Sequence, residues 1–334
     1  MNSRGNPNMR VCVYGAGAIG GHLAVRFARG GANVSVIARG PHLAAIQRDG
    51  LTVHAIDGKH HVTLPASDDP TQLGPQDAVV VTVKAPALPQ VAANIGPLLR
   101  RDTGVAFVMN GIPWWYFHAL PGKHEGHRLQ RIDPDDALWR AVGPERAIGG
   151  VVYAASAVTA PGVIAVEQPR SRVVFGEPNG RLSDRAEALA ALLRAGGIAG
   201  EVSPDIRTEI WNKLISNLAG GTLAVLAGAA PKAVYADPIC AAAGERVMQE
   251  AAAVAEALGS HPHPNFAQRI ASTASMDHKP SILQDLELGR PMEVDGIFDA
   301  PLDLARLAGV SVPTLELLVA LAKVRAREAG LYAV

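Results

Sequence analysis

Near the start of the chain stands Gly15-Ala16-Gly17-Ala18-Ile19-Gly20, a glycine-rich stretch between segments of different periodicity. The residues before it, Arg10 to Tyr14, form a short β-branched run that predicts a strand, whereas the apolar residues after it have helical spacing. At such a junction Gly15 permits a tight turn, Gly17 lets the backbone approach a pyrophosphate, and Gly20 lets the helix pack on the strand. The unpaired N–H groups at the start of the helix also attract phosphate. The alternative is that the glycines only turn a tight corner.

A second strand is predicted at Asn33 to Ala38 and completes a βαβ unit of about thirty residues. This context makes the glycine pattern specific, because the same residues outside a strand–helix junction carry little information. We therefore predict a Rossmann-type dinucleotide-binding domain in the N-terminal part of the chain. The predicted cofactor contacts of the loop are Gly15, Ala16, Gly17, Ala18, Ile19 and Gly20.

Two basic residues extend the predicted cofactor site. An NAD-specific site places Asp or Glu at the end of the second strand, but this chain has Arg39 there. An arginine binds a 2′-phosphate through two charge-assisted bonds, so Arg39 favours NADP(H). Lys84 follows the apolar strand Ala78 to Val83, at the edge where open α/β sheets bind ligands. The alternatives are a solvated surface Arg and a plain strand-end Lys.

Composition excludes several classes of protein. The 334 residues are 48% hydrophobic and 19% charged, enough to bury the cores of about two domains. Because 31 Lys and Arg balance 31 Asp and Glu, we expect no nonspecific binding of nucleic acid or of an anionic membrane. The two cysteines form no disulfide framework, and the opening Met1 to Arg10 stretch is polar with no apolar signal-peptide core. No uninterrupted apolar run is long enough for a membrane span. We expect a cytoplasmic protein with a small-molecule partner.

The alternation of helix and strand stops near Ser203-Pro204, where we place a domain boundary. We expect residues 1–8 to be a disordered extension. Residues 9–203 are predicted to form the NADP-binding domain, with an insertion at about 112–146, and residues 204–334 a helical substrate and catalytic domain. The predicted fold class is therefore α/β plus all-α.

Some individual elements can be predicted within this frame. Leu51 to Leu64, with Asp57-Gly58 at its middle, predicts a β-hairpin, and Leu88 to Leu99 predicts a crossover helix. Turn residues within Ala147 to Glu177 suggest extra strands on one edge of the sheet. The helices predicted beyond the boundary are Ile206 to Leu226, Pro238 to Leu258, Asn265 to Ala274, Asp295 to Leu307 and Pro313 to Arg327.

Several separated motifs follow one another along the chain, and their order helps to indicate a protein family. They are Met9 to Gly20, Arg39, Val83-Lys84, Asn110-Gly111, Trp211-Asn212-Lys213-Leu214 with Asn217, Ser281 to Asp285, and Glu293-Val294-Asp295. Together they resemble the ketopantoate reductase (2-dehydropantoate 2-reductase) family over about residues 9–323. The resemblance implies an NADPH-dependent reduction of 2-dehydropantoate to (R)-pantoate, a step of pantothenate and coenzyme A biosynthesis. It also implies an active site in the cleft between the two domains.

Lys213 is the predicted proton donor. Glu209, Lys213 and Asn217 are spaced by four, so they lie on one face of the predicted helix. The matching family lysine protonates the substrate oxygen, and the physics agrees, because hydride addition to a ketone builds negative charge that an ammonium stabilises. The alternative is an i to i+4 ion pair with Glu209 on a solvated face.

The resemblance assigns four further residues. Glu293 matches a carboxylate that binds the substrate hydroxyl and orients the lysine, although a carboxylate near a helix N-terminus is also favoured by the helix dipole. Asn110, which is expected to touch both nicotinamide and substrate, has a turn Asn as its alternative. Asn217 and Ser281 are expected to receive the substrate carboxylate and hydroxyls. Ser281 also fits an N-cap, with Gln284 completing a capping box.

Two features depart from the family pattern. Gly221 and His278 stand where the family usually carries asparagines, which puts the identity of the 2-keto acid in doubt. The segment Ile112 to Arg146 is longer than usual and rich in aromatics, so Trp114 to Phe117 are expected either to line the site beside Asn110 or simply to pack the insertion.

Three interpretations remain open at this point. The chain is a 2-dehydropantoate reductase, a related NADPH-dependent reductase of another 2-keto acid, or a non-catalytic NADP(H)-binding sensor. The histidines show no zinc-type spacing backed by cysteines, and no metal site is predicted. A homodimer is possible, because helices Pro238 to Leu258 and Pro313 to Arg327 have apolar faces that fit either the domain interior or a second subunit.

Overall fold

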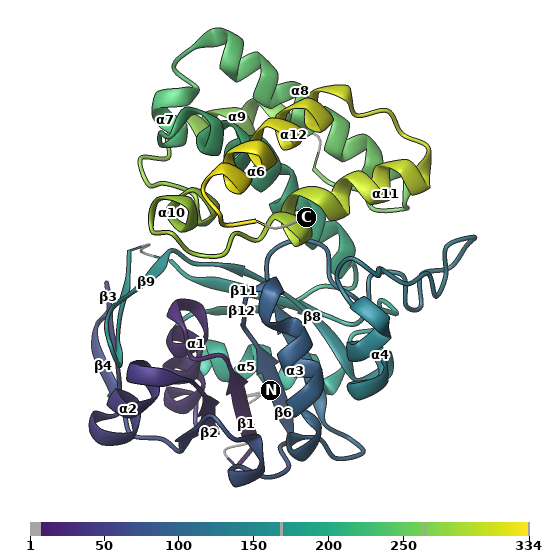
Figure 1. The fold of residues 1–334 in the computed structure, drawn as a ribbon. Helices are drawn as coiled ribbons and strands as arrows, with labels where there is room; N and C mark the ends of the chain where they lie inside the picture. Colours follow the sequence, from purple (N-terminus) through teal and green to yellow (C-terminus); the bar gives the residue numbers. More distant parts are fainter. Residues whose placement is uncertain (1–7, 168–169, 264, 333–334) are drawn as a thin grey trace. The chain divides into compact units, whose positions relative to one another are not determined.

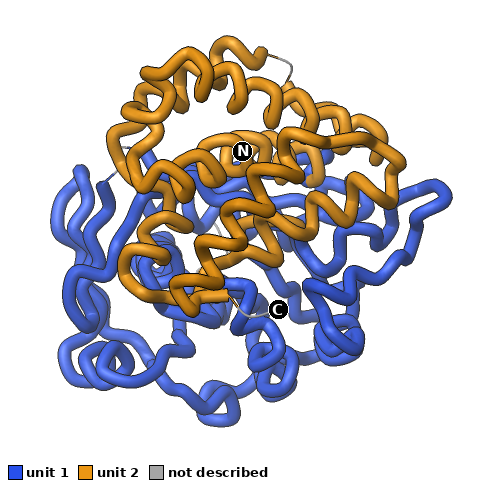
Figure 2. The backbone as a smooth tube through the Cα atoms, turned by 45° about the horizontal axis from the view of Figure 1, so that its top comes forward, with its two compact units in different colours: residues 1–109, 113–206 blue, residues 110–112, 207–334 orange. Residues whose placement is uncertain are grey.

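The computed structural model describes residues 8–167, 170–263 and 265–332. The expected N-terminal extension, apart from Asn8, lies outside the described residues. The chain divides into two compact units, which Figure 2 colours separately. Unit 1 contains residues 1–109 and 113–206, and unit 2 contains residues 110–112 and 207–334. The short segment Asn110–Ile112 thus belongs with the helical part of the chain.

Unit 1 is built on an eight-stranded sheet in the order β12-β11-β8-β7-β6-β1-β2-β5 (Figure 1). Neighbouring strands are parallel except β8 and β11, which are antiparallel. Every residue of β6 and β7 is buried, as expected for strands that are covered on both faces. The strands are β1 (Arg10–Tyr14), β2 (Asn33–Ile37), β5 (Ala66–Ser67), β6 (Ala78–Val81), β7 (Gly104–Val108), β8 (Ala147–Tyr153), β11 (Arg172–Gly176) and β12 (Ala199–Val202).

The helices of unit 1 connect these strands. The predicted crossover helix ends early, at Asn94, and a 3₁₀ turn follows at Gly96–Leu98, because Gly96-Pro97 interrupts the α-helix. Helices α2, α4 and α5 were not predicted from the sequence. The helices are α1 (Ala18–Arg29), α2 (Gly40–Asp49), α3 (Leu88–Asn94), α4 (Ala137–Ala141) and α5 (Asp184–Ala195).

A second, four-stranded sheet of unit 1 corrects one prediction. The predicted hairpin is confirmed as β3 (Leu51–Ala55) and β4 (Gly58–Val62), which are antiparallel. However, β9 (Ser156–Ala160) and β10 (Val163–Val166) do not extend the main sheet, because β10 pairs in parallel with β3. The order is β4-β3-β10-β9, and only β8 and β11 of the predicted edge strands belong to the main sheet. The pairing is long-range, so local turn signals do not reveal it.

Unit 2 consists of helices, with the short segment Asn110–Ile112 added. The predicted helix from Asp295 to Leu307 is in fact a π-helical turn followed by an α-helix, because Pro301 has no N–H for the regular hydrogen-bond ladder. Helix α8 packs against α11 and α12 within the unit. The helices are α6 (Ile206–Ala227), α7 (Pro231–Val234), α8 (Pro238–Ala257), α9 (Phe266–Ala274), α10 (Ser281–Glu287), the π-turn η6 (Asp295–Asp299), α11 (Ala300–Ala308) and α12 (Pro313–Glu328). Together the two units confirm the predicted fold class.

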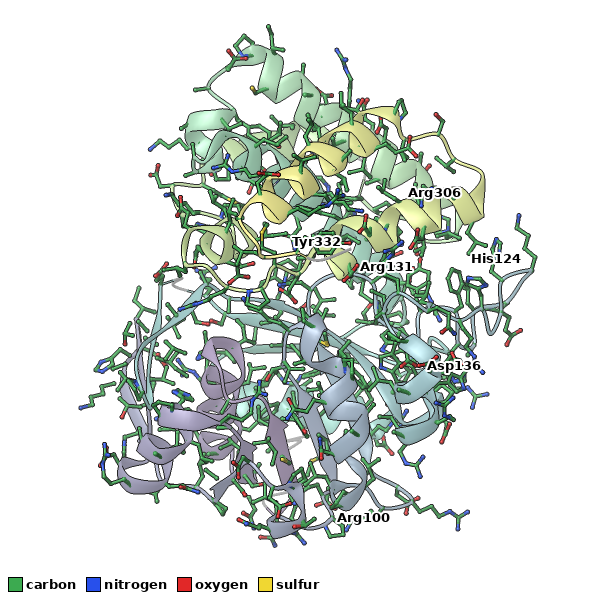
Figure 3. All side chains as sticks on the ribbon, viewed as in Figure 1. Arg100, His124, Arg131, Asp136, Arg306 and Tyr332 are labelled. Atoms are coloured by element: carbon green, nitrogen blue, oxygen red, sulfur yellow. The ribbon has the colours of Figure 1, made fainter. Side chains whose placement is uncertain are left out.

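The aromatic insertion forms a small core of its own in unit 1. Trp114 to Phe117 are at most 1% exposed, and Trp114 meets the rings of Phe107 and Trp139 edge-on at 5.5 and 5.8 Å between centroids. Both carboxylate oxygens of Asp133 accept backbone N–H groups at the start of α4. Figure 3 labels His124 on the loop that extends from this segment and Asp136 beside α4. These contacts support the packing interpretation of the insertion.

No helix in the described ranges combines the length and the apolar character needed to cross a bilayer.

Candidate functional site

The glycine loop is held in a turn that only small residues allow. The N–H groups of Gly15 and Ala16 both donate to the carbonyl oxygen of Ile37, at 3.0 Å each, which ties the loop to the end of β2. Gly15 has φ +103°, a conformation that side chains disfavour. A Cβ added to Gly20 would lie 2.0 Å from the Gly15 oxygen, so the first turn of α1 approaches the end of the β1 segment this closely only with glycine there. The uses predicted for Gly15 and Gly20 are thus visible in the backbone.

The N-terminus of α1 is available to an anion. Its N-cap residue is Gly17, no side chain caps the helix, and no acidic residue stands in its first turn. A Cβ at Gly17 would meet nothing within 4 Å, so open space lies in front of the loop. The uncapped N–H groups and this space fit a pyrophosphate.

The two predicted basic contacts lie at the same edge of the sheet. Arg39 is the exposed N-cap residue of α2, directly after β2, and its Nη1 donates to Oε1 of Gln90 at 2.7 Å. Lys84 is exposed and stands three residues after β6, which pairs with β1. Because β1, β2 and β6 are parallel, their carboxyl ends bring the loop, Arg39 and Lys84 to one edge of unit 1.

In unit 2, Lys213 lies on α6 and interacts electrostatically with Glu293. Burial lowers the pKa of Lys213 to about 8, and the Glu293 carboxylate acts in the opposite direction by favouring the charged form. Glu293 itself is 5% exposed. A lysine with this pKa holds a proton at neutral pH and releases it more readily than an ordinary surface lysine.

Asn110 joins this unit through its neighbours. The N–H of Ile112 donates to the carbonyl oxygen of Gly296 at 3.1 Å, three residues beyond Glu293. Gly111 has φ +83°, and a Cβ there would lie 2.3 Å from the same oxygen, so the two backbones meet only at a glycine. The turn after β7 is therefore fixed to the segment that carries Glu293, and Asn110 stands at the start of that turn.

Ser281 and Asn217 come from elements that meet at Gly221. Position 221 lies one turn after Asn217 on α6, and a Cβ there would be 3.4 Å from Ile282 and 3.7 Å from Phe298. The capping-box alternative for Ser281 is wrong: the N-cap of α10 is Pro280, with no side-chain cap, and the Gln284 amide donates to the carbonyl of Lys279. The Ser281 residue is exposed at the first turn of α10.

Comparison with known proteins places the chain in one family. The ketopantoate reductase PanE/ApbA model matches residues 11–180, and the model of its C-terminal domain matches residues 205–326. The chain belongs to the ketopantoate reductase family. It is therefore an oxidoreductase acting on CH–OH groups with a nicotinamide dinucleotide as coenzyme.

Three individual proteins illustrate the likeness. A 2-dehydropantoate 2-reductase of Mesorhizobium japonicum is 40% identical over 326 residues, which cover 97% of this chain and all of that protein. The crystal structure of 2-dehydropantoate 2-reductase from Geobacter metallireducens GS-15 is 28% identical with a TM-score of 0.83, covering 94% of this chain and 99% of its own. A D-mandelate dehydrogenase solved with NADH and anilino(oxo)acetate is 21% identical with a TM-score of 0.80, covering 97% and 100%, and shares the fold.

Several supporting residues of this ketopantoate reductase family member were missed from the sequence. In unit 2, Asp299 accepts hydrogen bonds from Lys323 Nζ at 2.7 Å and from the Tyr332 hydroxyl at 2.8 Å, which fixes the π-turn after Glu293. Figure 3 labels Tyr332. In unit 1, the Thr82 hydroxyl donates to the carbonyl of Gly15 at 2.7 Å. Hydrophobic periodicity does not predict the π-turn beside Glu293. In the sequence, Thr82 has the pattern of an ordinary strand residue.

Two further kinds of reactive site can be judged from the described residues. Burial raises the pKa of the Cys12 thiol to about 12, which suppresses the nucleophilic thiolate. Among the described residues, no group of three or more His, Cys, Asp or Glu is placed to hold a metal ion.

Proposed function

We propose that this chain reduces 2-dehydropantoate to (R)-pantoate with NADPH, the pantoate-forming step of pantothenate and coenzyme A biosynthesis. The observation that carries the proposal is Lys213, whose pKa is lowered to about 8 beside a buried Glu293. Bound NADPH would supply the hydride that adds to the C2 carbonyl carbon of the substrate. Side chains of this protein would donate the proton and position the substrate.

Lys213 acts as the proton donor. As the C2 carbonyl becomes an alkoxide, its oxygen gains negative charge, which the ammonium of Lys213 stabilises and then neutralises by giving up one proton from Nζ. The pKa of about 8 keeps the lysine protonated at neutral pH and eases this transfer. Glu293 favours the charged ammonium and is proposed to accept a hydrogen bond from the substrate hydroxyl.

Three polar residues are proposed to place the substrate. Asn217 and Ser281 receive its carboxylate and hydroxyls, and Asn110 contacts both the substrate and the nicotinamide. The support for Ser281 is that its hydroxyl does not cap α10. The support for Asn110 is the backbone bond from Ile112 to Gly296, which fixes its turn near Glu293.

Unit 1 is proposed to select NADP(H). Arg39 is exposed at the end of β2, and no acidic residue stands there to bind the free ribose hydroxyls. Its guanidinium would pair with the 2′-phosphate, and Lys84 would add a second positive charge at the same edge. Gly15 to Gly20 would receive the pyrophosphate at the uncapped start of α1.

A reductase of another 2-keto acid is the second candidate function, and Gly221 favours it. The family usually has an asparagine at this position, but Ile282 and Phe298 fill the surroundings of the position here. An amide at position 221 would displace one of these side chains. The surroundings of position 221 are therefore apolar and lack the amide of the family pattern, which suits a less hydroxylated acid.

The test is NADPH oxidation with a panel of 2-keto acids that includes 2-dehydropantoate, for the wild type and for Lys213→Ala. We expect turnover of 2-dehydropantoate, a loss of about 10²–10⁴-fold in kcat for the variant, and unchanged NADPH affinity. The matched control is Lys232→Ala, which removes an exposed lysine paired with Asp277 on the same unit and should leave kcat intact.

Each other result has a distinct meaning. Turnover of a different keto acid alone would favour the second candidate. NADPH binding without turnover of any acid would indicate a sensor, and a Lys213→Ala variant as fast as wild type would remove the lysine from the mechanism.

A further inference from the structure

His42 makes two hydrogen bonds that link separate parts of unit 1. Its Nε2 lies 2.7 Å from the carbonyl oxygen of Ala16, in the glycine loop. Its Nδ1 lies 3.0 Å from the backbone N of Gly162, in the turn between β9 and β10 of the second sheet. The residue stands in the first turn of α2, three positions after Arg39, and is half-buried.

These two partners fix the chemical form of the ring. A backbone N–H only donates, so the Nδ1 of His42 must accept from Gly162 and carries no proton. A carbonyl only accepts, so Nε2 must carry the proton and donate to Ala16. The geometry is therefore that of the neutral Nε2–H tautomer with both ring nitrogens satisfied.

The bond to Ala16 adds to a set of hydrogen bonds that hold the backbone of the glycine loop. The N–H groups of Gly15 and Ala16 are both occupied by Ile37, and the Gly15 carbonyl is held by the Thr82 hydroxyl. With the Ala16 carbonyl held by His42, the carbonyls of Gly15 and Ala16 are both bonded to side-chain donors, and the Gly17 carbonyl accepts the N–H of Gly21. A carbonyl oxygen turned toward a phosphate would repel it, whereas a carbonyl bonded to the protein is fixed before the anion arrives.

We propose that His42 is a positioning residue of the dinucleotide site, which orders the Ala16 carbonyl so that the N–H groups of α1 face the pyrophosphate. The inference rests on the proposed function, because it requires the glycine loop to bind NADPH. His42 itself touches no phosphate in this proposal, and its effect passes through the backbone of Ala16. Its second bond, to Gly162, keeps the ring in the orientation and tautomer that the first bond requires.

Two amide substitutions separate the two bonds. His42→Gln keeps a donor near the position of Nε2 and loses the acceptor at Nδ1, whereas His42→Asn keeps an acceptor near Nδ1 and loses the donor to Ala16. The control is His54→Asn, which changes an exposed histidine on β3 of the same unit. His42→Leu, which removes both bonds at similar volume, is the second variant in case His42→Asn does not fold.

The measurements are the NADPH dissociation constant by fluorescence titration, KM for NADPH, kcat at saturating NADPH, and the melting temperature. We expect His42→Asn and His42→Leu to weaken NADPH binding about tenfold, the size of one lost hydrogen bond at the upper end of its range. Their KM for NADPH should rise with kcat at saturation unchanged within about twofold, and His42→Gln should bind NADPH as the wild type does.

The inference is overturned if His42→Asn and His42→Leu bind NADPH with wild-type affinity. It is also overturned if His42→Gln and His42→Asn weaken binding equally while the melting temperature falls, because the histidine would then only stabilise the fold. A wild-type protein that binds no NADPH would instead refute the proposed function, so the two failures can be told apart.

Discussion

The glycine loop of unit 1 (Gly15 to Gly20) consists of backbone groups, whereas the proposed lysine site of unit 2 (Lys213 and Glu293) consists of charged side chains. Backbone groups form the loop, and the side chains that hold its carbonyls, Thr82 and His42, make neutral hydrogen bonds. The lysine site instead depends on charged side chains from different elements, with Lys213 on α6 and Glu293 just before the π-turn. The loop holds only partial charges, whose desolvation costs little free energy because they are hydrogen-bonded. The lysine site places full charges where burial disfavours the ionised form.

Because of this difference, we expect substitutions to affect the two sites differently. Most side-chain substitutions leave backbone N–H donors in place. Coenzyme binding by the loop should therefore be weakened mainly by substitutions at its glycines and at the residues that orient its carbonyls. A charged pair in a desolvated place depends on both partners, since removing one leaves the other uncompensated. We therefore expect the largest functional losses in unit 2 and graded losses of affinity in unit 1.

After the loss already expected for Lys213→Ala, the largest effect is expected for Glu293→Gln. Loss of the carboxylate should lower kcat by about 10²–10³-fold, because the lysine loses the charge that orients it and favours its protonated form. In the wild type, reduction needs protonated Lys213, so kcat is full below pH 8 and falls about tenfold per pH unit above it. Without Glu293 the pKa of Lys213 falls further, and the alkaline limb of the kcat profile should move to lower pH. An alkaline limb unmoved in Glu293→Gln would break the proposed coupling of the two residues.

The next effect concerns stability, in the aromatic insertion. Trp115 is fully buried, and its ring lies where a Cβ on Gly149 would be only 2.8 Å away. Trp115→Ala should lower the free energy of unfolding by about 3–5 kcal/mol, as expected for a large cavity. The relative kcat/KM values over the keto acid panel should stay unchanged. A changed order of preferred acids, with stability intact, would instead assign the insertion to the substrate site. Trp139→Ala, at a partly exposed ring of the same segment, should cost less stability.

A smaller, selective effect is expected for Arg39→Ala. Removing the guanidinium should weaken NADPH binding by about 10–100-fold, the range for a charge-assisted bidentate contact, and leave NADH binding nearly unchanged. Dissociation constants for both coenzymes, measured by fluorescence, provide the test, with Arg29→Ala at the exposed end of α1 as control. Equal losses for NADPH and NADH would show that Arg39 does not read the 2′-phosphate. Such equal losses would indicate that the glycine loop contributes most of the binding free energy of the coenzyme.

The strand–loop–helix structure of the glycine stretch could be predicted from the residues themselves, whereas the grouping of Lys213, Glu293 and Asn110 in one site rested on resemblance, for a physical reason. The residues of the loop are contiguous, and glycine spacing together with strand and helix periodicity is local information. By contrast, Lys213, Glu293 and Asn110 are separated by up to 183 residues of sequence, and no periodicity relates them. Their association depends on tertiary contacts such as the meeting of Gly111 with Gly296, which only the folded chain displays.

The errors in the fold have the same origin. Pairing of β10 with β3 joins segments about a hundred residues apart, and nothing local in either strand selects that partner. Likewise, α2 begins at Gly40-Pro41, two residues that more often mark a turn, so the helix that presents His42 was not predicted. His42 could have been found only from its position three residues after Arg39, a signal that has no meaning until α2 is known.

The smallest expected effect tests the departure from the family at position 221. Gly221 lies inside α6, and a Cβ there would make an ordinary contact of 3.4 Å with Ile282. Gly221→Ala should therefore raise stability by about 0.5–1 kcal/mol, the helix-propensity gain, with kcat unchanged. Gly221→Asn should instead lower stability, because its amide must displace Ile282 or Phe298. Thermal unfolding of both variants, with the keto acid panel as a second readout, makes the comparison. An asparagine variant that is stable and faster on 2-dehydropantoate would mean that the pocket has room for the family amide, and the argument for a different acid would fall with it.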